Sequence, residues 1–300
     1  MFVIVLVLFI VCIGMPLSYS WRVARLDVPT KGAWLIHVAD SSVLVALIFL
    51  VGRWDIAGYY MRFILMVVFL GAVLWSLRRH FSRPWVVREQ QGAIRQHWTT
   101  VTSLALFGGA LCYVVYGLVP PPAAREVVFP LDDGSFMIGQ GGGISVLNHH
   151  SSHREQRYSV DITRINSFGY RAAGLAPKEL DRYFIFGTTV VSPCTGDVIG
   201  TQNELPDLIP PKTDADNPRG NHVIVDCGDV LVELAHLQHG SVQVAAGASV
   251  SAGDPLGKIG NSGNTTEPHL HVHAVDPKTG EGVPMSFNGR LPARNTLYVD

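Results

Sequence analysis

The sequence predicts an α-helical membrane region of about four transmembrane helices, followed by an all-β domain built mostly of antiparallel strands as a sandwich or barrel-like sheet. Long apolar runs are confined to the first 120 of the 300 residues. The remainder has the composition of a soluble protein, with short strand-like runs between turn residues. We expect a helical anchor over residues 1–119, a Pro-rich linker over 120–125 and a β domain over 126–300.

Composition and charge limit the classes of function that the chain can have. A net charge of −1 offers no electrostatic basis for binding nucleic acid. The hydrophobic content of 48% is high because of the N-terminal part, whereas nine of the twelve histidines lie in the C-terminal part. About 180 residues are enough for a single hydrophobic core. The sequence therefore places its chemistry in the β domain.

Four apolar segments approach the roughly 20 residues that a helix needs to cross a bilayer: 1–18, 37–52, 60–77 and 99–119. The second segment is short and carries Asp40, so a membrane-surface or buried helix is its alternative. A cleavable signal peptide is the alternative for the first segment, although the basic n-region of such a peptide is missing.

Basic residues in the loops indicate the orientation. The second loop is flanked by only two, Arg53 and Arg62. The first and third loops carry more: Arg22, Arg25 and Lys31 in the first, and Arg78, Arg79, Arg83, Arg88 and Arg95 in the third. The positive-inside rule places these two loops in the cytoplasm and the C-terminal domain on the other side of the membrane.

Cysteine usage agrees with that location. Cys12 and Cys112 lie within apolar segments, whereas Cys194 and Cys227 lie beside strand ends of the β domain. An oxidising compartment would allow the latter two to pair, so a Cys194–Cys227 disulfide is a hypothesis of the sequence.

The β domain is expected to contain eight short strands, over 126–129, 158–162, 189–191, 198–200, 222–227, 230–236, 241–244 and 269–275. Gly228-Asp229 is a two-residue loop suited to a type II′ hairpin turn. A brief helix is expected over 177–182. The Pro- and Asp-rich stretch 201–220 is expected to be a long surface loop, of the kind that often forms a functional rim.

His269, His271 and His273 alternate along the last of these strands. Residues i, i+2 and i+4 of a strand share a face, so the three imidazoles are expected to project together. Imidazole is the commonest nitrogen ligand of zinc. The strand is therefore predicted to supply half of a metal site, with a solvated face of incidental histidines as the alternative.

Three other places offer ligands or catalytic groups: the stretch Asn148-His149-His150-Ser151-Ser152-His153, Asp161 in a strand, and His236 at the exit of the hairpin. Catalytic zinc takes three protein ligands and leaves a fourth position open. It also needs a nearby base or oxyanion stabiliser.

These motifs resemble the lysostaphin-type zinc endopeptidases, which cleave peptide cross-links or stems of bacterial peptidoglycan. The resemblance rests on Asp161, Ala235-His236-Leu237, Gly260-Asn261-Ser262-Gly263 and Pro268-His269-Leu270-His271, and covers about 187–275, more loosely back to 141. It implies a β-rich zinc peptidase domain. Together with the four apolar segments and the basic loops, it places the chain as a multi-pass protein in the bacterial inner membrane, with this domain expected on the periplasmic or extracellular side.

The resemblance implies roles for individual residues. His271 and Asp161 match zinc ligands, and His236 and His269 match the catalytic histidines. His273 has no role to transfer and is either a solvated neighbour or a group that supports a ligand. The common pattern places the remaining ligand four residues before the aspartate, where this chain has Arg157, which offers no lone pair.

A branch of the family with an Asn-x-His element ahead of the strand implies His150 as the missing ligand, with His149 and His153 as alternatives. The expected function is a membrane-anchored zinc metalloendopeptidase, a hydrolase acting on peptidoglycan or other envelope peptides. The alternatives are a catalytically silent envelope-binding or regulatory module, a phosphocarrier or lipoyl-like carrier domain, and a membrane sensor. The expected extracytoplasmic location disfavours the carrier.

Overall fold

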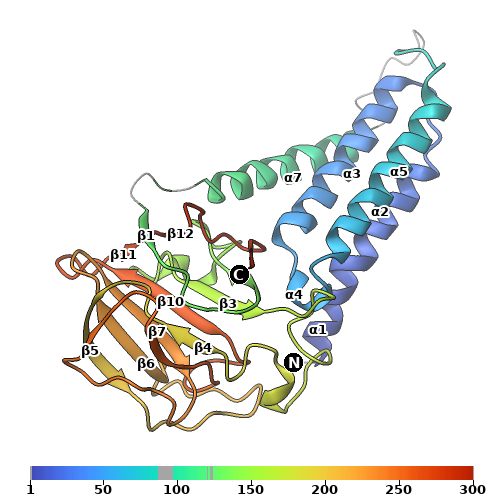
Figure 1. Ribbon diagram of the computed structural model, residues 1–300. Coiled ribbons are helices and arrows are strands. Elements are labelled where there is room, and N and C mark those ends of the chain that lie inside the picture. Colours follow the sequence, from blue (N-terminus) through green and yellow to red (C-terminus); the bar gives the residue numbers. More distant parts are fainter. Residues whose placement is uncertain (1, 87–96, 120, 122–123, 300) are drawn as a thin grey trace. The chain divides into compact units, whose positions relative to one another are not determined.

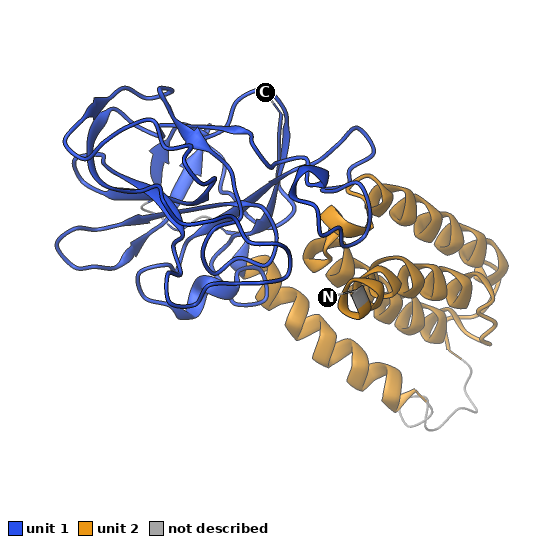
Figure 2. Cartoon of the chain, turned by 90° about the horizontal axis from the view of Figure 1, so that it is seen from below, with its two compact units in different colours: residues 1–2, 117–300 blue, residues 3–116 orange. Residues whose placement is uncertain are grey.

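The computed structural model describes residues 2–86, 97–119, 121 and 124–299. The chain forms two compact units, one of residues 3–116 and the other of residues 117–300 with residues 1–2 (Figure 2). Residues 120, 122 and 123 of the expected linker lie outside the described residues, as do Arg88 and Arg95 of the third loop.

The first unit is helical (Figure 1). Its elements are α1 (Phe2–Phe9), a π-helical turn (Ile10–Gly14), α2 (Met15–Ala24), α3 (Lys31–Val51), α4 (Trp54–Ala57), α5 (Met61–His80) and α7 (Trp98–Gly117). Four helices are long and apolar enough to cross a membrane by length and composition: Val3–Ala24, Lys31–Val51, Met61–His80 and Trp98–Gly117. Each of the four expected apolar segments thus corresponds to a helix, including the doubtful second one.

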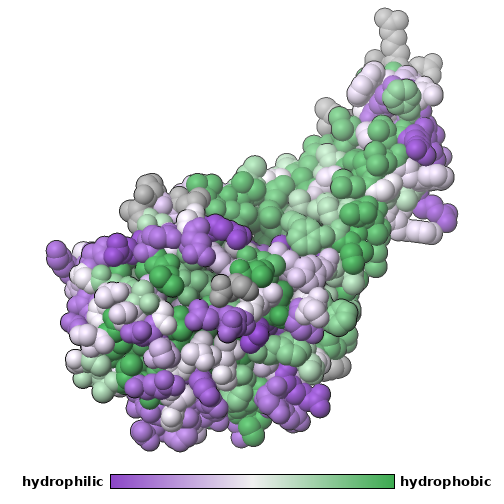
Figure 3. Space-filling view, viewed as in Figure 1, coloured by the Kyte–Doolittle hydropathy of each residue, from purple (hydrophilic) through white to green (hydrophobic). Residues whose placement is uncertain are grey.

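Local signals and packing explain the second of these helices. The hydroxyl of Thr30 caps α3 by accepting a hydrogen bond from the Ala33 N–H at 3.1 Å. Asp40 is buried within α3, and Arg22 of α2 lies 4.0 Å from its Oδ2 atom. Small apolar clusters join α2, α3 and α5, one of them built on Val23, Val38, Val45 and Phe69. Much of the remaining helix surface is hydrophobic, as lipid contact requires (Figure 3).

The second unit is a mostly antiparallel β domain. A nine-stranded sheet has the order β13-β2-β3-β10-β7-β6-β5-β8, with β11 paired to β10, and two-stranded sheets are formed by β4–β9 and by the parallel pair β1–β12. The strands are β1 (Arg125–Val127), β2 (Ser135–Gln140), β3 (Val160–Arg164), β4 (Thr189–Val191), β5 (Gly196–Gln202), β6 (Asn221–Asp226), β7 (Leu231–Leu237), β8 (Ser249–Val250), β9 (Pro255–Lys258), β10 (Leu270–Val275), β11 (Gly282–Val283), β12 (Met285–Phe287) and β13 (Leu297–Val299).

The large sheet is open, because β13 and β8 end its strand order without pairing to each other. The expectation of a barrel-like sheet is therefore wrong, whereas a helical region followed by a mostly antiparallel β domain is confirmed. The hydrophobic core includes one face of the large sheet together with residues of the small sheets. Leu270 and Val272 of β10 enter this core with Val190 of β4 and Leu256 of β9.

The period of two along each strand leaves the opposite face of the large sheet for polar residues. His271 alternates with Leu270 and Val272 on β10, and Asp161 alternates with Val160 and Ile162 on β3. This second face carries the candidate site.

Several elements differ from their expected positions. Strand β2 was not expected, because its sequence SFMIGQ includes Gly139. It forms because it pairs with both β3 and β13. The expected strand 241–244 makes single hydrogen bonds, such as Gln243 N–H to the Leu256 carbonyl, instead of a ladder. The expected helix over 177–182 is only a 3₁₀ turn at Leu180–Arg182.

The β6–β7 hairpin forms as expected. Cys227 N–H donates to the Val230 carbonyl at 2.9 Å, and Gly228 has φ +90°, the left-handed conformation that a type II′ turn requires at its first central position. Cys227 also forms a disulfide with Cys194, across a sequence separation of 33 residues. The bond ties this hairpin to the start of β5.

We expect replacement of Cys194 and Cys227 together by alanine to lower the free energy of unfolding of the β domain by roughly 4 kcal/mol, the chain-entropy value for a loop of this length. All six tryptophans lie in the helical unit. The measurement is therefore hydrogen exchange of peptides from β5 to β7 in the full chain across a urea series. Cys112→Ser, at an exposed free cysteine, is the control. An unchanged urea midpoint in the double variant would contradict a stabilising role for the disulfide.

Candidate metal centre

The register between two strands brings the carboxylate and one imidazole together. β3 pairs antiparallel with β10, and Asp161 and His271 are direct Cα partners. Their side chains therefore lie on the same face, and Asp161 Oδ1 is 2.9 Å from His271 Nδ1. Both residues are buried, with 9% and 4% of their surface exposed.

His150 reaches the same carboxylate from a 3₁₀ turn (His149–Ser152). Its Nε2 atom lies 3.2 Å from each oxygen of Asp161. The turn is anchored by Asn148, which is fully buried. Asn148 Oδ1 accepts from His150 N–H at 3.1 Å, and Asn148 Nδ2 donates to the Ser159 carbonyl at 3.0 Å, just before β3. In the sequence, Asn148 served only to identify the Asn-x-His element. The structure shows that its side chain positions His150.

The two alternatives to His150 are placed differently. His149 has a ring nitrogen within 4.8 Å of ligand atoms of His150 and Asp161, and its ring stacks at 3.8 Å on His150. His153 ends the 3₁₀ turn by donating its N–H to the His150 carbonyl at 2.8 Å. Arg157 contributes its carbonyl oxygen to Asn148, and its guanidinium lies over the Tyr158 ring.

The donor set fits a zinc ion. Tetrahedral zinc with bonds of about 2.0 Å holds its ligand atoms about 3.3 Å apart. The Asp161 oxygens lie at 2.9 and 3.2 Å from the nitrogens of His271 and His150. Burial alone would raise the pKa of Asp161, but the surrounding histidines hold it well below its usual range. Burial lowers the pKa of His271. The carboxylate is thus ionised and the imidazole neutral, as metal ligands must be.

His236 enters the site through an irregularity of β7. The β6–β7 register shifts between Asn221 and His222, which leaves His236 unpaired between Ala235 and Leu237. His236 has φ +65°, a left-handed conformation rare for this residue type. Such bulges re-aim a side chain, and here the His236 ring lies 5.8 Å from the His271 ring.

Two imidazoles have their Nδ1 atoms held by carbonyl oxygens. His236 Nδ1 lies 2.9 Å from the Ser262 carbonyl, and His269 Nδ1 lies 2.9 Å from the Glu267 carbonyl. A carbonyl can only accept, so Nδ1 carries the proton and Nε2 carries the lone pair in each neutral ring. The two rings are 4.8 Å apart, and His269 Nε2 is 3.7 Å from Asp161 Oδ1. Burial lowers the pKa of His236 well below its usual value, which keeps this ring neutral.

An ion pair between buried Arg171 and partly buried Glu267 supports the turn that carries His269. Arg171 is 4% exposed and donates to the carboxylate of Glu267 through Nε at 3.1 Å and Nη2 at 2.7 Å. The carbonyl of the same Glu267 holds His269. No pattern in the sequence indicates this role of Arg171, because the two partners are 96 residues apart and no motif includes the arginine.

His273 is 1% exposed, so the interpretation of this residue as a solvated neighbour is wrong. Its Nδ1 atom lies 3.2 Å from Nε2 of His271. His269 immediately precedes β10, and its Nε2 atom lies 3.7 Å from the same Asp161 oxygen that His271 contacts.

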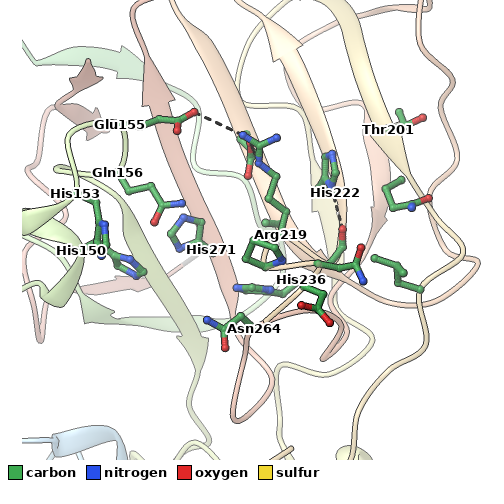
Figure 4. A pocket seen from close by; sticks show the side chains of 18 of the residues that line it. His150, His153, Glu155, Gln156, Thr201, Arg219, His222, His236, Asn264 and His271 are labelled. Atoms are coloured by element: carbon green, nitrogen blue, oxygen red, sulfur yellow. Dashed lines mark hydrogen bonds and ion pairs between the residues drawn. The ribbon is translucent and has the colours of Figure 1, made fainter. Parts of the chain in front are cut away.

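These groups open into a groove of about 1060 Å³ (Figure 4). His150, His236 and His271 line it with Arg219, Glu155 and His222. The loop expected to form a rim contributes Leu205 and residues 216–220, and the end of β5 contributes Thr201 and Gln202. A groove of this size and openness suits an extended peptide segment.

Comparison with known proteins gives one family. Residues 182–283 match the family model described as peptidase family M23. This segment contains His236, His269 and His271, while His150 and Asp161 precede it. None of the curated proteins matches the chain.

Solved structures that match the chain include a zinc-containing peptidase from Vibrio cholerae, with 18% identity over 54% of this chain and 38% of that one and a TM-score of 0.33. Lysostaphin from Staphylococcus simulans has 20% identity over 34% and 40%, with a TM-score of 0.22. Pseudoalterin, titled an M23 metalloprotease, has 14% identity over 59% and 100%, with a TM-score of 0.35.

The chain spans 38% of the Vibrio protein and 40% of lysostaphin, less than two thirds of either. The family match extends from the 3₁₀ turn at Leu180–Arg182 to β11. The chain therefore carries a domain of peptidase family M23, the lysostaphin-type family that its motifs resemble.

Proposed function

We propose that this protein is a membrane-anchored zinc metalloendopeptidase that hydrolyses peptide bonds in bacterial peptidoglycan or other envelope peptides. The observation that carries the proposal is the convergence of His150, Asp161 and His271 beside two imidazoles whose lone pairs are free at Nε2. The groove next to these groups supplies room for a peptide.

Each residue of the site has a separate role in the proposed reaction. His150, Asp161 and His271 hold the metal, and a bound zinc ion supplies Lewis acidity to a water molecule and to the scissile carbonyl. His236 or His269 takes a proton from the attacking water at Nε2. The protonated ring then donates to the oxyanion or to the leaving amine. Because Nδ1 of both rings stays bound to a carbonyl, the proton enters and leaves at Nε2.

We also propose that residues 1–119 anchor the protein in the bacterial inner membrane, with the peptidase domain of residues 126–300 on the periplasmic or extracellular side. The four apolar helices and the basic loops support this orientation. The Cys194–Cys227 disulfide agrees with it, because such bonds persist in oxidising compartments.

We expect the purified full chain in detergent to bind one zinc ion. Alanine at His150, Asp161 or His271 should weaken zinc binding at least ~100-fold, because each removal leaves two of the three protein ligands. The measurement is competition with a chromophoric chelator. His149→Ala and His153→Ala are the controls and should keep the metal. Loss of zinc in either control, with retention in His150→Ala, would move the ligand role to that histidine.

His236→Ala and His269→Ala should each lower kcat/KM by about 100-fold or more while zinc content stays unchanged, because both variants remove a proton acceptor and leave the ligands intact. Cleavage is measured on intact peptidoglycan and on synthetic stem and bridge peptides. His239→Ala, at an exposed histidine outside the groove, is the control. A zinc-loaded wild-type chain that cleaves none of these substrates would contradict the enzyme and support the silent module.

Arg171→Ala should lower kcat by roughly 10-fold to 100-fold with little change in zinc content, because Glu267 loses the partner that holds the His269 turn. Arg171→Lys should fall in between, since an ammonium cannot make the bidentate contact. Arg182→Ala, at an exposed arginine of the same loop region, is the matched control. Wild-type kcat in Arg171→Ala would show that the turn holds its shape without the ion pair.

A further inference from the structure

Two buried polar atoms on neighbouring strands have no hydrogen-bond partner among the described residues. They are Nε2 of His273 on β10 and Oε1 of Glu233 on β7. Leaving such atoms unpaired in a low-dielectric interior is unfavourable, and a native structure does so for a reason. His273 and Glu233 are direct Cα partners in the β10–β7 ladder, so their side chains stand side by side on one face.

The same face links these atoms to the candidate metal site. His273 Nδ1 lies 3.2 Å from His271 Nε2, and His271 Nδ1 lies 2.9 Å from Asp161 Oδ1. At the other end, Glu233 Oε2 forms an ion pair with Arg219, whose Nε atom lies 3.0 Å away. Asp161, His271, His273 and Glu233 are all residues with less than one tenth of their surface exposed. The polar groups therefore form a row from the metal site to the groove residue Arg219.

The direction of hydrogen bonding along this row depends on the metal. Without metal, the Asp161 carboxylate can only accept, so His271 Nδ1 carries the proton and His271 Nε2 accepts from His273 Nδ1. His273 Nε2 then carries the lone pair, and no hydrogen-bond donor among the described residues reaches it. A metal ion at His271 Nδ1 requires the lone pair there, and the ring proton must move to Nε2.

That change reverses the whole row. His271 Nε2–H then donates to His273 Nδ1, so the His273 proton must sit on Nε2. The unpaired oxygen of Glu233 is the acceptor that stands opposite. Each imidazole carries one proton in both arrangements, so the reversal changes no net charge on either ring. In the metal-bound arrangement the two unpaired atoms are therefore a donor and an acceptor on directly paired residues.

We propose that His273 and Glu233 are positioning residues for the metal site, which hold His271 in the tautomer whose Nδ1 binds zinc through the chain His271 Nε2–H to His273 Nδ1 and His273 Nε2–H to Glu233 Oε1. The proposal rests on the zinc site of the proposed function. Outer-shell partners of this kind alter metal affinity by roughly 10-fold to 100-fold.

The test uses the full chain in detergent and measures zinc affinity by chelator competition. His273→Phe keeps the ring volume and removes both hydrogen bonds, so zinc should bind roughly 10-fold to 100-fold more weakly. His273→Gln can accept and donate at once and should restore most of that loss. Glu233→Gln keeps the accepting oxygen and should bind zinc like the wild type. Glu233→Met lacks that oxygen and should bind zinc more weakly. His222→Phe, on the same sheet face but bonded to the Gly220 carbonyl, is the control.

Long-range ¹H–¹⁵N NMR of histidine-labelled chain supplies a readout that a merely structural role would not move. The His271 proton should sit on Nδ1 without zinc and on Nε2 with zinc, and His273 should switch in the same way. The switch of His273 should be absent or incomplete in Glu233→Met.

The outcomes are separable. If the wild type binds no zinc, the proposed function fails, and this inference fails with it. If the wild type binds zinc and His273→Phe binds equally well while remaining folded by thermal midpoint, the inference alone is overturned. A zinc-bound wild type with the His273 proton on Nδ1 would overturn it as well.

Discussion

The pairing register of β3 with β10 is the constraint on which the site depends. Asp161 stands opposite His271 because Val160 and Ile162 on one strand, and Leu270 and Val272 on the other, all enter the core on the far face. A slip of one residue would exchange the faces and place the carboxylate among apolar side chains, where an unpaired charge is prohibitively unfavourable. The packing of the hydrophobic core therefore sets the geometry of the candidate site on the opposite face of the sheet.

A buried group of polar side chains is costly unless each has a defined partner. In this domain most of the partners are main-chain carbonyls or neighbouring members of the site. Ser262 illustrates the coupling, because its carbonyl holds His236 while its hydroxyl donates to the Leu237 carbonyl and accepts from Asn221 N–H. The alternation of core-facing and polar residues is interrupted at this place, where β7 bulges and His236 takes a left-handed conformation. The regular strand geometry is interrupted here, and the interruption aims the His236 side chain into the site.

The sequence predicted what depends on local pattern. Strand alternation places Asp161 and His271 on polar faces, and the Gly228 turn defines the hairpin that leads to His236. It could not predict what depends on long-range packing. Arg171 meets Glu267 only because two distant loops fold together, and a single sequence contains no sign of that contact. The burial of His273 is similar, since the pattern shows which face a residue occupies but not whether other chain segments cover that face.

The histidines of this domain have the same side chain. They differ in which groups contact their two ring nitrogens. His236 and His269 give Nδ1 to carbonyl oxygens, which leaves Nε2 as a base. His271 turns Nδ1 toward Asp161 instead, and its Nε2 meets another imidazole. Because the tautomer follows from the partner of one ring nitrogen, the carbonyls of Ser262 and Glu267 determine which rings keep a lone pair at Nε2. Side-chain identity alone would allow any of these rings to bind metal or to act as a base. The backbone geometry of two turns removes that ambiguity.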